Sequence, residues 1–277
     1  MWCSTGKPVV LCDKDPKQIE AATAYVNENV GAQSALMEAK RGTMTGVTSL
    51  QEAVKDAWMV IEAIPEILDL KINLLGQVDE LVGDDCIIAS NSSSYRSSQM
   101  LNHVQKRFAS LVNLTSQCIL KDVRFRVLNT HYYSPPKHKC VELMSCGHTD
   151  SAIINLLLRE CASVGFVPVH VKKESTGFIF NRIWAAIKRE SLDVMAEGVA
   201  EPKDIDILFK DWFAAERGPS EMMDEVGLDT VWNIEKNYVE QRGLKHDTLD
   251  WLRREYVDRG MLGQKTGNNG LLGRTAS

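Results

Sequence analysis

Polar side chains that could carry out chemistry follow three apolar stretches of the sequence. Asp13 follows residues 9–12, a serine-rich cluster at 91–94 follows residues 86–90, and His131 lies near the end of residues 127–133. An imidazole gains and loses a proton near neutral pH, so His131 could act as a general acid or base. A histidine can equally be a satisfied core residue, and an aspartate can close any strand-to-helix turn. The residue types alone therefore leave chemistry and structure both open.

The elements that must position these clusters alternate between strands and helices. Apolar runs predict short buried strands, and helical spacing of apolar residues predicts helices between the first of them. The strands are predicted at residues 9–12, 58–63, 86–90, 127–133, 141–144 and 165–171, and the helices at 16–30 and 67–81. Such alternation indicates an α/β fold with a doubly wound, Rossmann-type parallel sheet. Ligands bind at the carboxyl ends of the strands in such sheets, where the polar clusters lie.

The alternation stops after residue 171, and the rest of the sequence reads as helices. Helices are predicted at residues 177–198, 202–213 and 219–239. We place the boundary near Lys173, which predicts an α/β domain over residues 1–173 and an all-α domain over residues 174–277. Residues 109–126 interrupt the α/β rhythm and show no clear period.

Composition excludes several classes of function. The net charge of -5 gives no basic field for a nucleic-acid backbone, and no apolar run approaches the length of a membrane span. The seven cysteines include no C-x-x-C pair, and the group Cys140, Cys146 and His148 matches no metal-site spacing. We therefore expect a cytoplasmic protein that acts on a small molecule and holds no metal.

Several segments, taken in order, resemble motifs of the 3-hydroxyacyl-CoA dehydrogenase family, which also includes lambda-crystallin-like and gulonate dehydrogenases. The resemblance covers nearly the whole sequence apart from residues 109–126 and 268–277. It rests on the strand-end Asp13, V-I-E-A-I-P-E at 60–66 with Lys71, A-S-N-S-S-S at 89–94, H-Y-Y-S-P-P at 131–136, V-E at 141–142, G-F-I-F-N-R at 177–182, G-P through G-L-D at 218–229 and G-Q-K-T-G at 263–267. No single motif is specific to the family, but the occurrence of all these motifs in the family's order is.

The resemblance implies a hydride transfer between NAD and the 3-position of an acyl-CoA or a small hydroxy acid. His131 would be the general base, and Glu142 would fix its tautomer and stabilise the imidazolium. Ser93 and Asn181 would hydrogen-bond the substrate oxygen and a neighbouring carbonyl.

The same resemblance implies a set of cofactor contacts and a dimer. Asp13 would accept hydrogen bonds from the adenosine ribose, which favours NAD over NADP. Glu66, Lys71, Ser93 and Lys265 would complete the NAD contacts. The all-α domain would supply the contact of a homodimer.

The sequence also departs from the family. A strand and a G-x-G-x-x-G loop precede the equivalent of this segment in the family, so we expect an N-terminally truncated sheet that either closes up or stays open. Ser134 replaces an asparagine of the family. Three functions stay open: an NAD-dependent 3-hydroxyacyl-CoA dehydrogenase, a dehydrogenase of free hydroxy acids such as L-gulonate, and a catalytically impaired paralogue with a binding or structural role.

Overall fold

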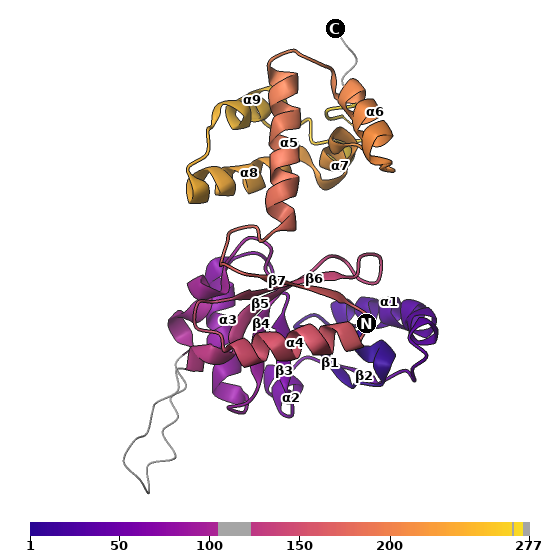
Figure 1. Ribbon diagram of the computed structural model, residues 1–277, viewed down its shortest axis with the longest axis vertical. Coiled ribbons are helices and arrows are strands. Elements are labelled where there is room, and N and C mark those ends of the chain that lie inside the picture. The colour runs from indigo at the N-terminus through magenta and orange to yellow at the C-terminus, as the bar shows by residue number, and fades with distance from the viewer. Residues whose placement is uncertain (105–122, 268, 274–277) are drawn as a thin grey trace, which may run out of the picture. The chain divides into compact units, whose positions relative to one another are not determined.

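The computed structural model describes residues 1–104, 123–267 and 269–273. It divides into two compact units, Met1–Phe178 and Ile179–Ser277. The first contains the strands and the second is helical, which confirms the predicted α/β and all-α classes (Figure 1). None of the helices in the described ranges is long and apolar enough to cross a membrane.

The strands of the first unit form two separate sheets (Figure 1). Strand β1 (Val9–Cys12) pairs in parallel with β2 (Met44–Val47). The larger sheet has the order β3-β4-β5-β6-β7. Its strands are Met59–Glu62, Ile87–Ser90, Val127–Tyr132, Cys140–Ser145 and Val167–Val171. Within the described ranges no pairing joins the two sheets, so the sheet stays open.

The larger sheet is parallel except at one pair of strands. β5 and β6 run antiparallel, and the other neighbours in the larger sheet run parallel. Only residues 133–139 connect β5 to β6, whereas a parallel crossover needs a dozen residues or more. The short connection therefore reverses the chain direction and makes the sheet mixed.

Helices cover both faces of the larger sheet, which explains its apolar central strands. Successive residues of β4 alternate between two cores: Ile88 packs with Leu75 on one side, and Ile87 packs with Leu157 on the other. The helices of this unit are α1 (Pro16–Leu36), α2 (Leu50–Val54), α3 (Leu68–Leu81) and α4 (Ser151–Ser163). The sequence patterns predicted α1 and α3 but neither α2, α4 nor β2.

The second unit contains α5 (Phe180–Ala196), α6 (Pro202–Phe213), α7 (Pro219–Val226), α8 (Leu228–Arg242) and α9 (Asp247–Glu255). The prediction of one helix over 219–239 is wrong because the chain breaks at Gly227. Its φ of 98° is one that glycine adopts readily and other residues avoid. A Cβ there would also lie 2.5 Å from the Lys265 side chain. Helix α9 was not predicted.

Most of the aperiodic segment 109–126 lies outside the described residues. Its end, Val123–Arg126, is a 3-10 helix that leads into β5. Arg126 is buried, and its guanidinium contacts the Asp79 carboxylate at 2.6 Å and donates to the Gly83 carbonyl. This end of the segment is therefore anchored to α3 and the turn that follows it.

Candidate active site

Three strands of the larger sheet bring polar side chains together at their carboxyl ends. The Asn91 N–H, just after β4, donates to the Glu62 carbonyl at the end of β3 (2.9 Å). The Asn91 side-chain oxygen accepts from the Tyr132 N–H at the end of β5 (2.9 Å). These bonds fix the serine-rich loop between the ends of β3 and β5, at the edge where the sequence placed its candidate site.

A buried ion pair closes the end of β3. The Lys71 ammonium, on α3, lies 3.1 and 3.0 Å from the two Glu62 carboxylate oxygens, and it donates to the Ile64 carbonyl at 3.0 Å. Lys71 and Glu62 are 1% and 4% exposed. The Ser90 hydroxyl also donates to Glu62. Lys71 reaches Glu66 at 3.1 Å as well, so its N–H groups are engaged inside this unit.

Glu66 is the more accessible member of this group, and it organises the loop after β4. Its Oε1 accepts from the Ser92 hydroxyl at 2.5 Å and from the Ser94 N–H at 2.8 Å. Burial alone would raise the pKa of Glu66, but the hydrogen bond from Ser92, the Lys71 charge and the Ser94 N–H together lower it. Glu66 is therefore held as a carboxylate at the carboxyl edge of the sheet.

His131 and Glu142 face each other across the antiparallel pair of strands. They are register partners on β5 and β6, and both are buried. His131 Nδ1 lies 3.8 Å from Glu142 Oε2, which is too long for a hydrogen bond. Within the described residues Nδ1 has no hydrogen-bond partner. The hydroxyl of Tyr133 donates to that same Oε2 atom instead.

Aromatic rings hold the imidazole in place. Phe178 stacks on the His131 ring with centroids 5.0 Å apart, and Tyr133 meets the ring edge-on at 4.4 Å. The histidine is therefore fixed by packing, while its carboxylate partner stands just out of reach. The arrangement is that of an oriented base with a potential carboxylate partner.

The remaining predicted site residues lie in several places. Ser93 is exposed on the loop after β4, and Asp13 is exposed after β1. Asn181 and Lys265 belong to the second unit: Asn181 lies in the first turn of α5, and Lys265 contacts Asp229 and Thr230, both at 2.8 Å. The functional roles of these residues stay predictions.

Sequence reasoning assigned no role to Glu62, Ser92 or Tyr133. Glu62 was part of a quoted motif, but nothing in the sequence showed its bond to Lys71. Tyr133 stands two residues after His131, so strand alternation could have placed both side chains on one face.

The first unit fits part of an NAD molecule. The Asp13 carboxylate, which the sequence analysis expected to accept from a ribose, follows β1, and its Oδ1 accepts from the Asp15 N–H at 2.9 Å. The helix that follows is less suited to a phosphate, since the Asp15 carboxylate caps it and Pro16 has no N–H. Within the described ranges, Asp13 therefore leaves an exposed carboxylate for the expected ribose contact, whereas this helix start does not fit the pyrophosphate.

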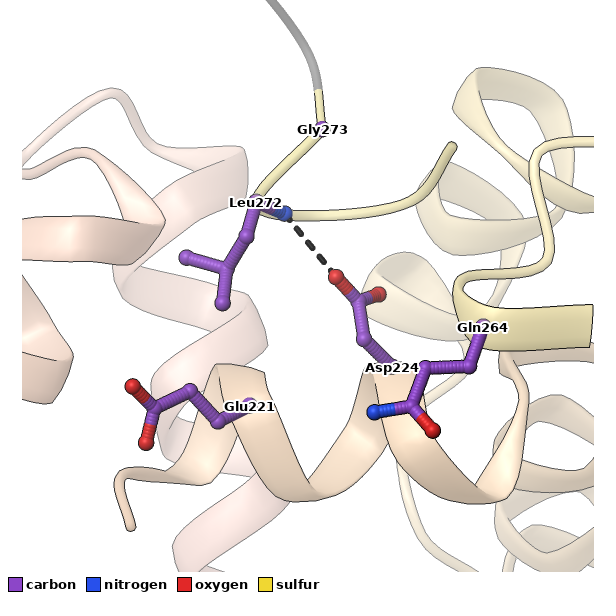
Figure 2. A pocket seen from close by; sticks show the side chains of 5 residues that line it. All are labelled: Glu221, Asp224, Gln264, Leu272 and Gly273. Carbon is purple, nitrogen blue, oxygen red and sulfur yellow. Dashed lines mark hydrogen bonds between the residues drawn. The ribbon is translucent and has the colours of Figure 1, made fainter. Parts of the chain in front are cut away.

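The second unit has a hollow of about 210 Å³ beside Asp224 (Figure 2). Asp224 accepts from the N–H groups of Leu271 and Leu272 at 2.9 and 3.0 Å. Burial raises the pKa of Asp224 although these two bonds oppose the shift. The carboxylate thus fastens the segment after α9, which indicates a structural role. In the described part of the chain no group of three or more His, Cys, Asp or Glu side chains could hold a metal.

Comparison with known proteins assigns both units. Residues 1–175 match the family described as "3-hydroxyacyl-CoA dehydrogenase, NAD binding domain", and residues 177–271 match "3-hydroxyacyl-CoA dehydrogenase, C-terminal domain". The NAD-binding description names the cofactor that the sequence analysis expected.

Individual relatives agree with this assignment. A 3-hydroxyacyl-CoA dehydrogenase-like protein of Cochliobolus heterostrophus is 46% identical over 148 residues, which are 53% of this chain and only 31% of that protein's length. A 3-hydroxybutyryl-CoA dehydrogenase of Clostridioides difficile is 28% identical over 96% of this chain and 90% of its own.

A solved structure extends the agreement to the fold. The (S)-3-hydroxybutyryl-CoA dehydrogenase of Ralstonia eutropha superposes with a TM-score of 0.78 at 27% identity, covering 97% of this chain and 91% of its own. The two matched regions together span most of the sequence. This chain belongs to the 3-hydroxyacyl-CoA dehydrogenase family of oxidoreductases.

Proposed function

We propose that this chain is an NAD-dependent oxidoreductase of 3-hydroxyacyl-CoA substrates, with His131 as its general base. The observation that carries the proposal is the pairing of His131 with Glu142 across β5 and β6, at 3.8 Å and with both side chains buried. Membership of the family and the similarity to two 3-hydroxybutyryl-CoA dehydrogenases support the substrate class.

In this proposal each polar group has one task. The neutral His131 imidazole takes the proton of the 3-hydroxyl group, and Glu142 stabilises the resulting imidazolium. Bound NAD supplies the acceptor for the hydride. Ser93 and Asn181 hydrogen-bond the substrate oxygen and a neighbouring carbonyl, where charge develops.

The proposed cofactor contacts take into account which partners each side chain already has. Asp13 accepts the ribose hydroxyls, and Glu66 faces the cofactor with its carboxylate set by Ser92, Ser94 and Lys71. Lys265 is a weaker candidate because Asp229 and Thr230 already engage its ammonium.

We also propose a homodimer through the second unit. Helix α6 exposes large apolar side chains, with Leu208 70% and Trp212 83% exposed. Apolar surface of this kind favours a contact between copies. Trp212→Glu should lower the sedimentation coefficient to that of a monomer, while an already monomeric wild-type protein would contradict the dimer.

The test of the function is the oxidation of NADH by acetoacetyl-CoA, followed by absorbance at millimolar NADH, so that a weak cofactor site is still filled. His131→Gln should lower kcat by about 10²–10⁴, the usual contribution of a general base. His170→Gln, on strand β7 of the same sheet, is the matched control and should keep the activity.

Two outcomes would count against the proposal. Turnover of free acetoacetate without turnover of acetoacetyl-CoA would replace the substrate class by free keto acids. A folded protein that binds NADH and reduces neither compound would leave the binding or structural role as the better interpretation.

A further inference from the structure

Phe178 has an unusual backbone conformation directly beside the candidate base. Its φ is 55°, in the left-handed region that a bulky aromatic residue seldom occupies. The preceding residue, Gly177, has a φ of 82°, which costs a glycine little. The conformation at Phe178 is therefore strained, and a strained residue persists only where its surroundings hold it in place.

The surroundings of the Phe178 side chain show what holds it. The next two residues are also apolar and are 41% and 53% exposed, whereas Phe178 is 2% exposed. Its side chain packs with Met144 and Val171. The phenyl ring also lies on the His131 imidazole, with centroids 5.0 Å apart and an angle of 25° between the ring planes. The strained turn therefore places a flat ring against the face of the base.

This stack decides which edge of the imidazole faces Glu142. A half-turn of the His131 ring about its Cβ–Cγ bond would exchange Nδ1 with the Cδ2 carbon, and only Nδ1 can pair with a carboxylate. Nδ1 lies 3.8 Å from Glu142 Oε2, so a hydrogen bond to that oxygen does not prevent the exchange. A half-turn would sweep the imidazole through the volume that Phe178 fills, so the stacked ring prevents it.

We propose that Phe178 is a positioning residue, whose strained backbone holds the phenyl ring on His131 and whose ring keeps Nδ1 on the side of Glu142. In the mechanism proposed above, this arrangement leaves the carboxylate ready to stabilise the imidazolium when the base takes its proton. The catalytic effect of the stack therefore rests on the proposed function. The stack itself is a property of the folded first unit, which contains all three residues.

Phe178→Leu tests the stack, because leucine keeps an apolar side chain in the core and removes the flat ring. The readout is the order parameter of the His131 Cδ2–H bond, from ¹³C NMR relaxation of the whole chain without substrate or cofactor. His131→Gln identifies the signal among the six histidines. The order parameter should be about 0.85 in wild type, the value of a rigid group, and should fall below about 0.6 in Phe178→Leu.

Phe166→Leu is the matched control. It makes the same substitution at another buried phenylalanine of the first unit, which packs against Tyr132 in a different hydrophobic core. The His131 order parameter should stay at its wild-type value. An equal fall in both variants would overturn the proposal, because it would show only a general loosening of the unit. A mobile His131 ring in wild type would also overturn it, and that measurement needs no variant to fold.

The backbone strain has a test of its own in Phe178→Gly and Phe178→Ala. Both variants remove the ring, and they differ only in the Cβ atom. Glycine is usually less stable than alanine in a folded chain, but at a left-handed position the order reverses. Phe178→Gly should therefore have a Tm about 2–4 °C above that of Phe178→Ala. A Phe178→Ala protein at least as stable as Phe178→Gly would overturn the proposal, because the backbone would not be held in the left-handed region.

The activity assay separates this proposal from the proposed function. With acetoacetyl-CoA and NADH, Phe178→Leu should lower kcat about 10- to 100-fold and leave KM within about twofold, since a misplaced base weakens the chemical step and not substrate binding. An unchanged kcat would overturn the positioning role. A wild-type chain without activity, but with a rigid His131 ring that Phe178→Leu loosens, would contradict the proposed function and still support the stack.

Discussion

The substitution Lys71→Met tests how much of the first unit's stability depends on one buried charge. The ammonium of Lys71 is 1% exposed and contacts both oxygens of Glu62, whose side chain is also 1% exposed. Methionine keeps much of the volume and removes the charge. Among the described residues, the Glu62 carboxylate would stay buried with only the Ser90 hydroxyl and the Ile64 N–H as partners.

Removing one partner of a buried ion pair costs about 3–5 kcal/mol, because the other charge is left uncompensated. The contact with Glu66 adds little, since that side chain is 36% exposed and water screens it. We therefore expect Lys71→Met to lower the free energy of unfolding of the first unit by about 3–5 kcal/mol. Adding Glu62→Gln removes the stranded charge and should restore most of this loss.

Urea unfolding followed by the amide NMR signals of β4 reports on the first unit alone. Lys17→Met is the control, because this exposed lysine at the start of α1 should change stability by less than about 0.5 kcal/mol. A cost below about 1 kcal/mol for Lys71→Met would refute the reasoning, because a buried pair should lose far more. So would a double variant that is no more stable than the single one.

Three further outcomes follow from the structure. Gly263→Ala should destabilise the second unit by about 1–3 kcal/mol more than Gly243→Ala in thermal unfolding. Both glycines have positive φ, but only at Gly263 would a Cβ lie 2.3 Å from the Asp224 carbonyl oxygen. Equal losses of stability would contradict this prediction. The lowered pKa of Glu66 gives stability that is present above its unfolded pKa and lost as pH falls through the folded pKa. Wild type should therefore lose more stability than Glu66→Gln between about pH 5 and 3. Urea midpoints that fall equally with pH in both proteins would contradict this. Titration calorimetry of this chain should show no micromolar NADH binding, because the start of α1 does not fit the pyrophosphate and the lack of donors there weakens binding by about 3–6 kcal/mol; micromolar affinity would mean that other residues supply them.

Strand β4 could be predicted from the sequence because it is a largely apolar run that is buried on both faces. Three of the four residues of β4 are apolar, and Ile87 and Ile88 enter different cores. The direction of β6 was not predicted, because an apolar run looks the same in both directions. The length of the connection between β5 and β6 does indicate the direction, because residues 133–139 are too few for a parallel crossover.

The resemblance led us to expect that His131 and Glu142 face each other. They do so because they are register partners on β5 and β6. The Tyr133 hydrogen bond was not predicted, because it depends on the side-chain rotation of Glu142, which no local pattern encodes. The break at Gly227 was missed for a different reason. Apolar spacing continues through 219–239, and only the backbone conformation at the glycine separates the two helices.

The separation of β1 and β2 from the larger sheet affects how the first unit fluctuates. A parallel pair of four-residue strands has little stability of its own, and it is held partly by aromatic packing of Trp2 against Trp58 and Phe166. We expect this pair to open without unfolding β3–β7, so its amides should exchange with deuterium earlier. Because Asp13 directly follows β1, part of any binding energy for a ribose would go into suppressing that opening. Slower exchange at β1 would then indicate an occupied site.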